Sequence, residues 1–187
     1  MYFSKKPSDN VPAGIQTFKK ARNNGTTQFL LNLYLFPMKL TTSKLNKFLF
    51  FKLPSAFICG VRVTTIDEKK CVVSVKHRWI NQNPFNSMYF AVQAMAAELA
   101  TGALVMFQIQ KSGKIISMLG ANNKGNFTKK ATGRITFTCN DGHLIEQAIQ
   151  ETIKTGEGQT FWMKSIGTDE KGIQVSEMDF EWSVRAK

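Results

Sequence analysis

Residues 81–110 constrain the fold of this chain more than any other stretch. The segment opens with a turn at Asn83-Pro84 and then runs for about six helical turns with hardly a polar side chain. No proline occurs from residue 88 to residue 109, and Ala, Leu and Met dominate, which favours a helix. Asn86 or Ser87 can cap the helix, because their side-chain oxygens accept the unpaired amides of a first turn. We therefore predict one long helix that begins near residue 88.

Glu98 is the one ionisable group inside this helix. A helix that is apolar nearly all round is usually buried in a protein core. Its length would also suit a membrane span, but a charge at its middle is costly in lipid. The sequence therefore predicts the central helix of a soluble domain, wrapped by a sheet, and no transmembrane segment. A buried carboxyl group needs a partner or a function.

The composition bounds the class of protein. A chain of 187 residues that is 43% hydrophobic can form one domain with a large core. We expect residues 1–55 to form an N-terminal helical extension and residues 56–187 the main domain. Three widely spaced cysteines and the lack of a recognisable signal peptide indicate a cytoplasmic protein with reduced thiols. His77 and His143 have no metal-ligand spacing, and motifs typical of nucleotide cofactors or serine hydrolases are missing, so we expect neither a metal nor a cofactor.

The net charge of +12 predicts attraction to polyanions, or simply a solvated basic surface. Residues 29–57 combine many Phe and Leu residues with several lysines. One interpretation is a set of helices packed on the domain, starting with short helices at 15–22 and 28–36. The other is an apolar basic lid over an acyl chain, or a contact with a membrane surface.

The rest of the chain alternates with a period of two, which is typical of strands. Residues 61–65 and 71–79 form a predicted hairpin before the long helix. The strands that we expect after it lie at residues 115–121, 132–140, 160–167 and 173–184, with a polar break at 122–126 and a short helix at 143–155. This order predicts an α+β domain in which one antiparallel sheet curls around a single helix.

The pattern resembles the hotdog fold, and the segment NPFNSMYFAVQAMAAELATG, residues 83–102, carries the resemblance. It is similar to the active-site loop and central helix of phenylacetyl-CoA-type acyl-CoA thioesterases, and also to an uncharacterised branch of that superfamily, a domain of unknown function. In that family, an Asn in the loop precedes a His-Gly-Gly sequence and an acidic residue follows along the helix. Asn83 and Glu98 stand at these two positions, 15 residues apart.

The resemblance implies an acyl-CoA thioesterase with Glu98 and Asn83 as catalytic residues. Free amides near Tyr89 and Phe90 would polarise the thioester carbonyl, Glu98 would be the general base or nucleophile, and Gln93 would orient water or carbonyl. A basic rim for the CoA phosphates is expected at Lys129, Lys130 and Arg134. Each of these residues also has a structural interpretation: an ion pair between Glu98 and Arg78, a turn shaped by Asn83, or a solvated edge strand.

The chain departs from the family at Tyr89-Phe90-Ala91, which replaces His-Gly-Gly. Phe90 then either blocks the approach of the thioester or donates its own amide from a reshaped pocket. Ser87 and Glu98 are about 16 Å apart along one helix, so that this carboxylate cannot act at the start of its own helix. We therefore expect a homodimer, or a dimer of dimers, in which two antiparallel helices share the site.

Two other functions compete with the hydrolase. The first is a non-catalytic hotdog protein that binds an acyl or aromatic ligand. The second is a nucleic-acid-binding module, which the charge alone suggests. We do not expect nucleic acid as a partner, because the aromatic residues cluster with Leu and do not alternate with basic residues.

Overall fold

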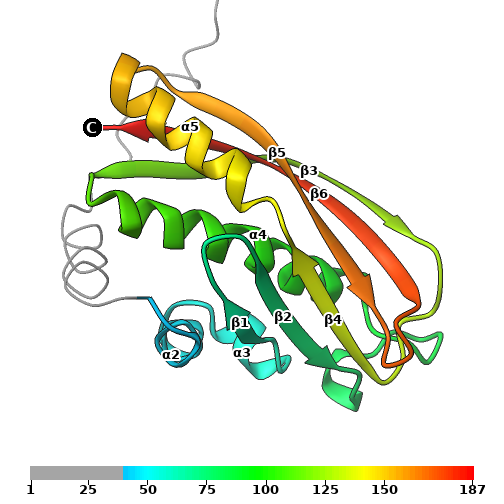
Figure 1. The fold of residues 1–187 in the computed structure, drawn as a ribbon. Coiled ribbons are helices and arrows are strands. Elements are labelled where there is room, and N and C mark those ends of the chain that lie inside the picture. The colour runs from blue at the N-terminus through cyan, green and yellow to red at the C-terminus, as the bar shows by residue number, and fades with distance from the viewer. Residues whose placement is uncertain (1–39) are drawn as a thin grey trace, which may run out of the picture. The chain divides into compact units, whose positions relative to one another are not determined.

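The computed structural model describes residues 40–187, so the helices expected at 15–22 and 28–36 lie outside the described residues (Figure 1). Two short helices come first, α2 (Thr42–Lys52) and α3 (Pro54–Ile58). Thr41 caps α2 by accepting the amide of Lys44 on its hydroxyl, and Pro54 begins α3 at a position where a missing N–H costs nothing. Leu45 and Leu49 of α2 are buried in the same core as the main domain.

Six strands form one antiparallel sheet in the order β1-β2-β4-β5-β6-β3. Their bounds are β1 Arg62–Ile66, β2 Cys71–Lys76, β3 Ile116–Phe127, β4 Arg134–Cys139, β5 Gln159–Thr168 and β6 Gln174–Ala186. Two helices complete the domain, α4 (Phe90–Ser112) and α5 (Gly142–Thr155). The sheet curls around α4, and α5 packs against α4, β5 and β6 (Figure 1). This is the predicted α+β hotdog architecture.

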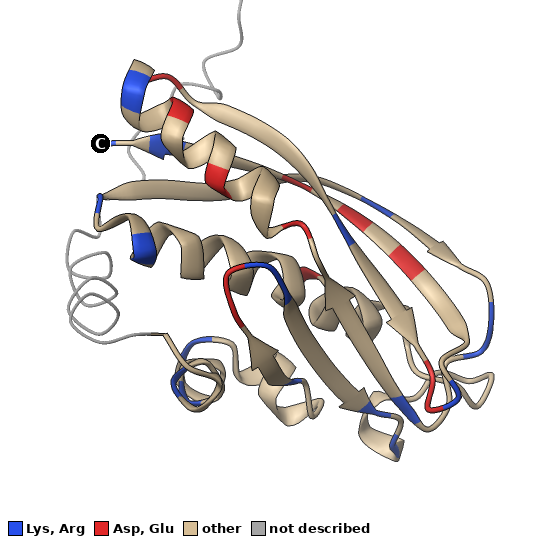
Figure 2. Ribbon diagram, viewed as in Figure 1, with Lys and Arg blue, Asp and Glu red and all other residues tan. Residues whose placement is uncertain are grey.

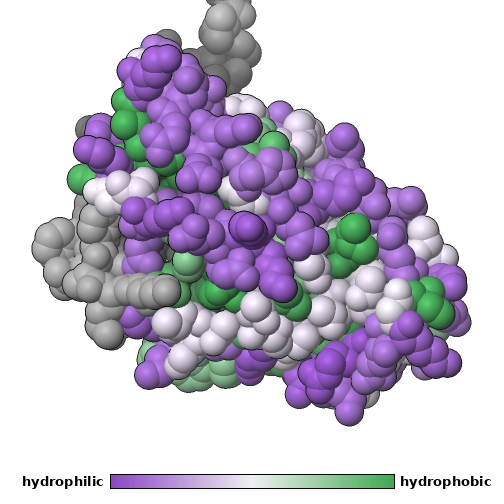
Figure 3. Space-filling view, in the orientation of Figure 1, coloured by the Kyte–Doolittle hydropathy of each residue, from purple (hydrophilic) through white to green (hydrophobic). Residues whose placement is uncertain are grey.

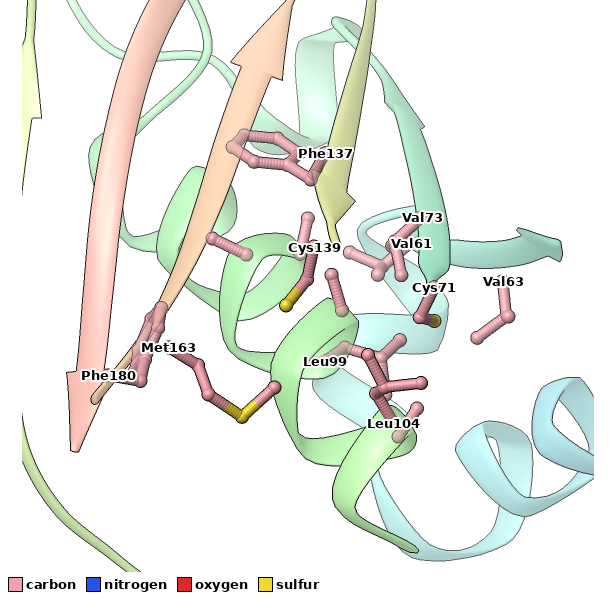
Figure 4. Packing of buried hydrophobic residues seen from close by; sticks show 14 of the residues in the cluster. Val61, Val63, Cys71, Val73, Leu99, Leu104, Phe137, Cys139, Met163 and Phe180 are labelled. Atoms are coloured by element: carbon pink, nitrogen blue, oxygen red, sulfur yellow. The ribbon is translucent and has the colours of Figure 1, made fainter. Parts of the chain in front are cut away.

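The core lies between α4 and the concave face of the sheet. Its buried residues include Phe137, Met163 and Phe180 from three strands and Leu99 and Leu104 from α4 (Figure 4). Burial raises the pKa values of the neighbouring thiols of Cys71 and Cys139 to about 12. All three cysteines of the chain are unpaired, as expected.

The α4 helix is long and apolar enough to cross a membrane by composition, with a mean hydropathy of 1.6 in its most apolar window. In the structure 67% of that window is buried, which identifies α4 as the core helix of the domain. A buried hydrogen bond fixes it to β6, where the Trp182 indole donates to the Thr101 hydroxyl at 2.9 Å. The Gln108 side chain donates to the Glu68 carbonyl at 2.7 Å and ties α4 to the β1–β2 turn.

Two local predictions were wrong. The α4 helix begins at Phe90 rather than near Met88, because Met88 donates its amide to the Ala131 carbonyl and forms an extended bridge with Gln82. Residues 122–126 are not a break but part of β3, which pairs with β6 over its whole length around a bulge near Gly120. The strand is polar and exposed there, so that no alternation marks it.

Candidate functional site

The loop before α4 is a tight turn built on the side chain of Asn83. Its Oδ1 accepts the amides of Phe85 and Ser87 at 2.9 and 3.2 Å, and its Nδ2 lies 3.0 Å from the Ser87 hydroxyl. Asn86 sits inside this turn with a positive φ of 55°, a conformation that Asn tolerates. The hydrogen-bonding groups of Asn83 are therefore engaged within the loop, so that its side chain positions the turn.

Asn81 anchors the other end of this loop. It is buried, and its Nδ2 donates to the carbonyls of Cys59 and Lys76, both at 2.9 Å. Its own carbonyl accepts the amide of Tyr89 at 2.9 Å. The residue that precedes α4 is thereby fixed to the end of β2 and to the end of α3, which orients the start of the helix.

The first turn of α4 has free amides. Tyr89 occupies the cap position, and its carbonyl accepts the amides of Val92 and Gln93 at 3.0 and 3.3 Å. Within the described part of the chain, the amides of Phe90 and Ala91 have no hydrogen-bond acceptor, and no side chain caps them. Free amides at the positive end of a long helix can stabilise a negative oxygen.

A pocket of about 520 Å³ opens beside this helix terminus. It is lined by the loop, by the first turn of α4 and by the chain that follows β3: Asn83, Pro84, Phe85, Ser87, Met88, Tyr89, Phe90, Gln93, Phe127, Thr128, Lys129, Lys130 and Ala131. The ring of Phe90 meets those of Tyr89 and Phe127 edge to face, with ring centroids 4.9 and 6.2 Å away. Six of the eight predicted site residues therefore line one pocket.

The predicted basic rim is only partly present at this pocket. Lys129 and Lys130 line it, and the Lys130 ammonium donates to the Phe85 carbonyl at 3.1 Å. Arg134 is exposed at the start of β4, opposite Lys76 of β2, and does not line the pocket.

Gln93 places an unsatisfied polar atom against the pocket. Only 4% of the residue is exposed, and its Nε2 donates to the Met88 carbonyl at 3.3 Å. Its Oε1 is buried with no hydrogen-bond partner among the described residues. A buried acceptor without a partner is costly, so that this oxygen is ready to accept a hydrogen bond from a ligand or water.

Glu98 lies about two helical turns beyond Phe90 on α4 and does not line the pocket. It is half-buried, and its carboxylate has neither a salt bridge nor a hydrogen bond within residues 40–187. Arg78, the alternative ion-pair partner, instead packs its guanidinium against Gly60. Burial raises the pKa of Glu98 above its ordinary value, and no charged neighbour in the described chain lowers it.

Glu98 and Trp182 both lie close to Gly102. A side chain at Gly102 would come within 3.0 Å of the Trp182 ring and 3.3 Å of Glu98 Oε1. The absence of a side chain at residue 102 thus leaves room for both groups. Eight residues separate Glu98 from Phe90, or about 12 Å along the helix. The carboxylate cannot reach the amides at the start of its own helix.

A sequence comparison now identifies the family. Residues 41–184 match the sequence model of a domain of unknown function, DUF4442. The chain belongs to the DUF4442 family. No curated protein matches this DUF4442 chain in sequence.

Solved structures share its fold. One is a Pseudomonas aeruginosa protein of unknown function that is described as a probable thioesterase. It has 22% identity and a TM-score of 0.69, and the match covers 80% of this chain and 99% of that one. Another is a Haemophilus influenzae thioesterase, with 14% identity, a TM-score of 0.62, and coverage of 81% and 95%.

A Staphylococcus aureus protein has been solved as two alanine variants, both with a TM-score of 0.56. The variant described as a thioesterase enzyme replaces a glutamine, with 15% identity and coverage of 71% of this chain and 98% of that one. The other variant replaces a glutamate, with 16% identity and coverage of 71% and 99%.

Sequence reasoning missed several residues of this candidate site. Phe85 and Phe127 line the pocket, and Trp182 lies, like Glu98, next to Gly102. Phe127 ends a strand whose polar sequence concealed it, and Trp182 is 84 residues from Glu98 in the chain. Phe85 alone carried a signal, since it lies inside the loop that supported the resemblance.

Proposed function

We propose that this protein is an acyl-CoA thioesterase whose site is shared between two subunits. The observation that carries the proposal is Glu98, a half-buried carboxylate with a raised pKa and no partner in the described chain, on the helix whose open N-terminus borders the pocket. Perturbed carboxyl groups of this kind are characteristic of catalytic sites. Neighbours described as thioesterases share the fold, and this supports the same class of reaction.

The chemistry needs an oxyanion site, a base and a water. The amides of Phe90 and Ala91 would bind the carbonyl oxygen as it becomes negative. Glu98, whose raised pKa makes it a better base, would take a proton from water as the water oxygen attacks the carbonyl carbon. The C–S bond then breaks, and the thiolate receives the proton. Gln93 Oε1 is placed to hold the water or the substrate, and Asn83 supports the loop.

A dimer would bring the missing carboxylate to the pocket. The edge strand β3 is exposed from Leu119 to Phe127 and has no partner on its outer side within the described chain. Pairing two copies of β3 about a two-fold axis extends the sheet and sets the two α4 helices antiparallel. Glu98 of one copy then approaches the α4 terminus of the other. The half-exposed Met95 and Ala94, next to Glu98 on α4, supply an apolar surface for this contact.

The pocket favours an acyl group attached to a phosphorylated carrier. Pro84, Phe85, Phe90 and Phe127 give it apolar walls that suit an acyl or aromatic group. Lys129 and Lys130 line it, and their ammonium groups would pair with the phosphates of CoA.

A non-catalytic ligand-binding role is the alternative, and Tyr89-Phe90-Ala91 favours it. The rings of Tyr89 and Phe90 lie where the resembled family has His-Gly-Gly, and both line the pocket. In this case the pocket binds an acyl or aromatic ligand, and no thiol is released.

The decisive experiment measures free thiol released from short-chain, long-chain and aromatic acyl-CoAs. We expect Glu98→Gln to lower kcat by about 10²–10⁴-fold. Glu151→Gln is the matched control, because Glu151 is exposed on α5 away from the pocket. No turnover by the folded wild type would favour the binding role, and equal turnover by Glu98→Gln would remove Glu98 from the mechanism.

Subunit complementation tests the shared site. If Gln93→Ala and Glu98→Gln each inactivate the enzyme, the refolded mixture should recover up to about a quarter of wild-type activity. Half of the dimers would then be mixed, and each mixed dimer would hold one intact site. A mixture as inactive as its two components would contradict the shared site, even if the wild type hydrolyses thioesters.

A further inference from the structure

A second surface, independent of the pocket, combines exposed apolar side chains with basic residues. We call it the basic apolar face. Its apolar members are Phe50, Phe51, Leu53, Ile58, Trp79 and Ile80, and its basic members are Lys47, Lys52, Arg62, Lys76 and Arg78. Trp79 and Phe51 are 82% and 74% exposed, values that are unusual for large apolar residues.

Direct contacts make this face continuous across two segments. The rings of Phe51, Phe50 and Phe57 form a chain with centroids 4.8 and 5.0 Å apart, and the Arg62 guanidinium lies 3.6 Å over Phe57. Burial lowers the pKa of Arg62, and the nearby charge of Arg78 lowers it further.

The second segment follows β2 and is tied to the first. Arg78 packs so closely on Gly60 that a side chain at residue 60 would clash with the Arg78 guanidinium. The short 3₁₀ helix Trp79–Asn81 follows directly, and Asn81 bonds it to the carbonyl of Cys59. Trp79 and Ile80 are thus held beside the end of α3. Along the lower margin of Figure 3, apolar atoms are visible over α2 and α3.

The charge of this face has one sign. From residue 40 to residue 97 the only acids are Asp67 and Glu68, which lie in the β1–β2 turn at the other end of the hairpin, where Glu68 pairs with Lys111. In Figure 2, α2 and the segment after β2 carry basic residues only, whereas most acids lie on α5, on β6 and at the turns. One acidic residue, Glu170, lies at the border of the basic apolar face. It packs against Gly133, whose carbonyl accepts the amide of His77, the residue between Lys76 and Arg78.

We propose that the basic apolar face docks the protein on an anionic lipid surface. Aromatic and aliphatic side chains would enter the interface between headgroups and acyl chains, while the lysines and arginines contact the lipid phosphates and carboxylates. A second copy of the chain is a poorer occupant, because it would bring the same cations together. Nucleic acid is also a poorer partner, because the side chains of Leu53, Ile58 and Ile80 cannot stack on bases, whereas a lipid interface would bury them.

The location of the face is compatible with the proposed dimer and does not depend on it. The α2 helix packs on β1, at one edge of the sheet, whereas β3 forms the opposite edge. A dimer that pairs through β3 therefore leaves the α2 side of each subunit free. Lipid docking is also independent of the proposed hydrolase activity, since Glu98 and the pocket residues take no part in it.

The test is cosedimentation of the full chain with vesicles of phosphatidylcholine alone and of phosphatidylcholine mixed with phosphatidylserine. We expect binding to the phosphatidylserine vesicles that weakens as salt rises, and much weaker binding to the neutral vesicles. Lys47→Gln with Lys52→Gln should lower the partition coefficient at least about fivefold. Phe51→Ser with Trp79→Ser should lower it about tenfold or more.

Controls come from surfaces outside this face. Trp162→Ser changes an exposed residue of β5, which β2 and β4 separate from β1, and Lys154→Gln removes a charge from the last turn of α5. Both should bind vesicles as the wild type does, and circular dichroism should show all variants folded.

Several results would overturn the proposal. These are equal binding to neutral and anionic vesicles, unchanged binding of both double variants, or an equal loss in the controls. The Phe51 and Trp79 variant could also keep its vesicle binding but lose self-association or the binding of a single-stranded oligonucleotide. Either result would assign the face to another partner.

Discussion

The two halves of α4 differ sharply although they form one helix. From Leu99 to Gln108 every residue except Met106 is buried, and Leu104 and Val105 are completely enclosed. From Phe90 to Glu98 fewer than half of the residues are buried, and Phe90 is 55% exposed. The C-terminal half has strands and α5 around it, whereas the N-terminal half borders the pocket.

The two halves of α4 therefore have different roles: one stabilises the fold, and the other carries the groups proposed for catalysis. The enclosed half fixes the helix through packing and through the Thr101–Trp182 hydrogen bond. The open half contains groups that have no partner within residues 40–187 and that do not stabilise the fold: the amides of Phe90 and Ala91, the Oε1 of Gln93, and the carboxylate of Glu98. Such unsatisfied groups concentrate at functional sites, and the rest of the fold offsets their cost.

The largest effect should come from truncating the enclosed half. Leu104→Ala removes a fully buried side chain and should lower the free energy of unfolding by about 2–5 kcal/mol. Met95→Ala, a half-buried residue of the open half, should cost less than about 1 kcal/mol in unfolding. Urea denaturation measures both. Equal losses of unfolding free energy would show that the two halves of α4 contribute alike to stability, which would contradict the difference drawn here.

A smaller effect is expected where the enclosed half meets Glu98. Trp182→Phe removes the donor to the buried Thr101 hydroxyl and should cost about 1–2 kcal/mol in unfolding free energy. A double-mutant cycle with Thr101→Val isolates the bond, because each single variant removes the same interaction. Additive losses would mean that this hydrogen bond contributes nothing of its own.

The sequence predicted much of this fold because strong local signals agree with it. The apolar run of α4, the alternating β1–β2 hairpin and the amphipathic α5 each show their own period. The loop resemblance also placed Asn83, Tyr89, Phe90 and Gln93 around one helix terminus, and these residues line the pocket.

The remaining features depend on tertiary partners. The start of α4 is set by Asn81 and Ala131, which accept the amides of Tyr89 and Met88 from outside the helix. The outer part of β3 has no apolar face, and only its pairing with β6 makes it a strand. Trp182 comes from a distant strand to lie next to Gly102, as Glu98 does. No periodicity within the chain carries such information.

The smallest expected effect is on the stability that the fold loses by burying Glu98, which lies in the open half of α4. Burial raises the pKa of this carboxyl group, so the folded chain binds its proton more tightly than the unfolded chain does. The contribution of Glu98 to stability is therefore complete below the ordinary pKa of a glutamate and is lost as pH rises through the raised pKa.

Glu98→Gln removes this ionisation. Above the raised pKa it should increase the free energy of unfolding by roughly 1 kcal/mol, or about 2–4 °C in Tm. Below the ordinary pKa of a glutamate, where Glu98 is protonated in both the folded and the unfolded chain, wild type and variant should melt together. Glu151→Gln should leave the Tm unchanged in both pH ranges. Thermal melts across this pH range measure the difference. A variant that is less stable than the wild type at high pH would mean that the carboxylate has a stabilising partner. Increased stability together with lost turnover would identify Glu98 as a residue kept for chemistry at the expense of the fold.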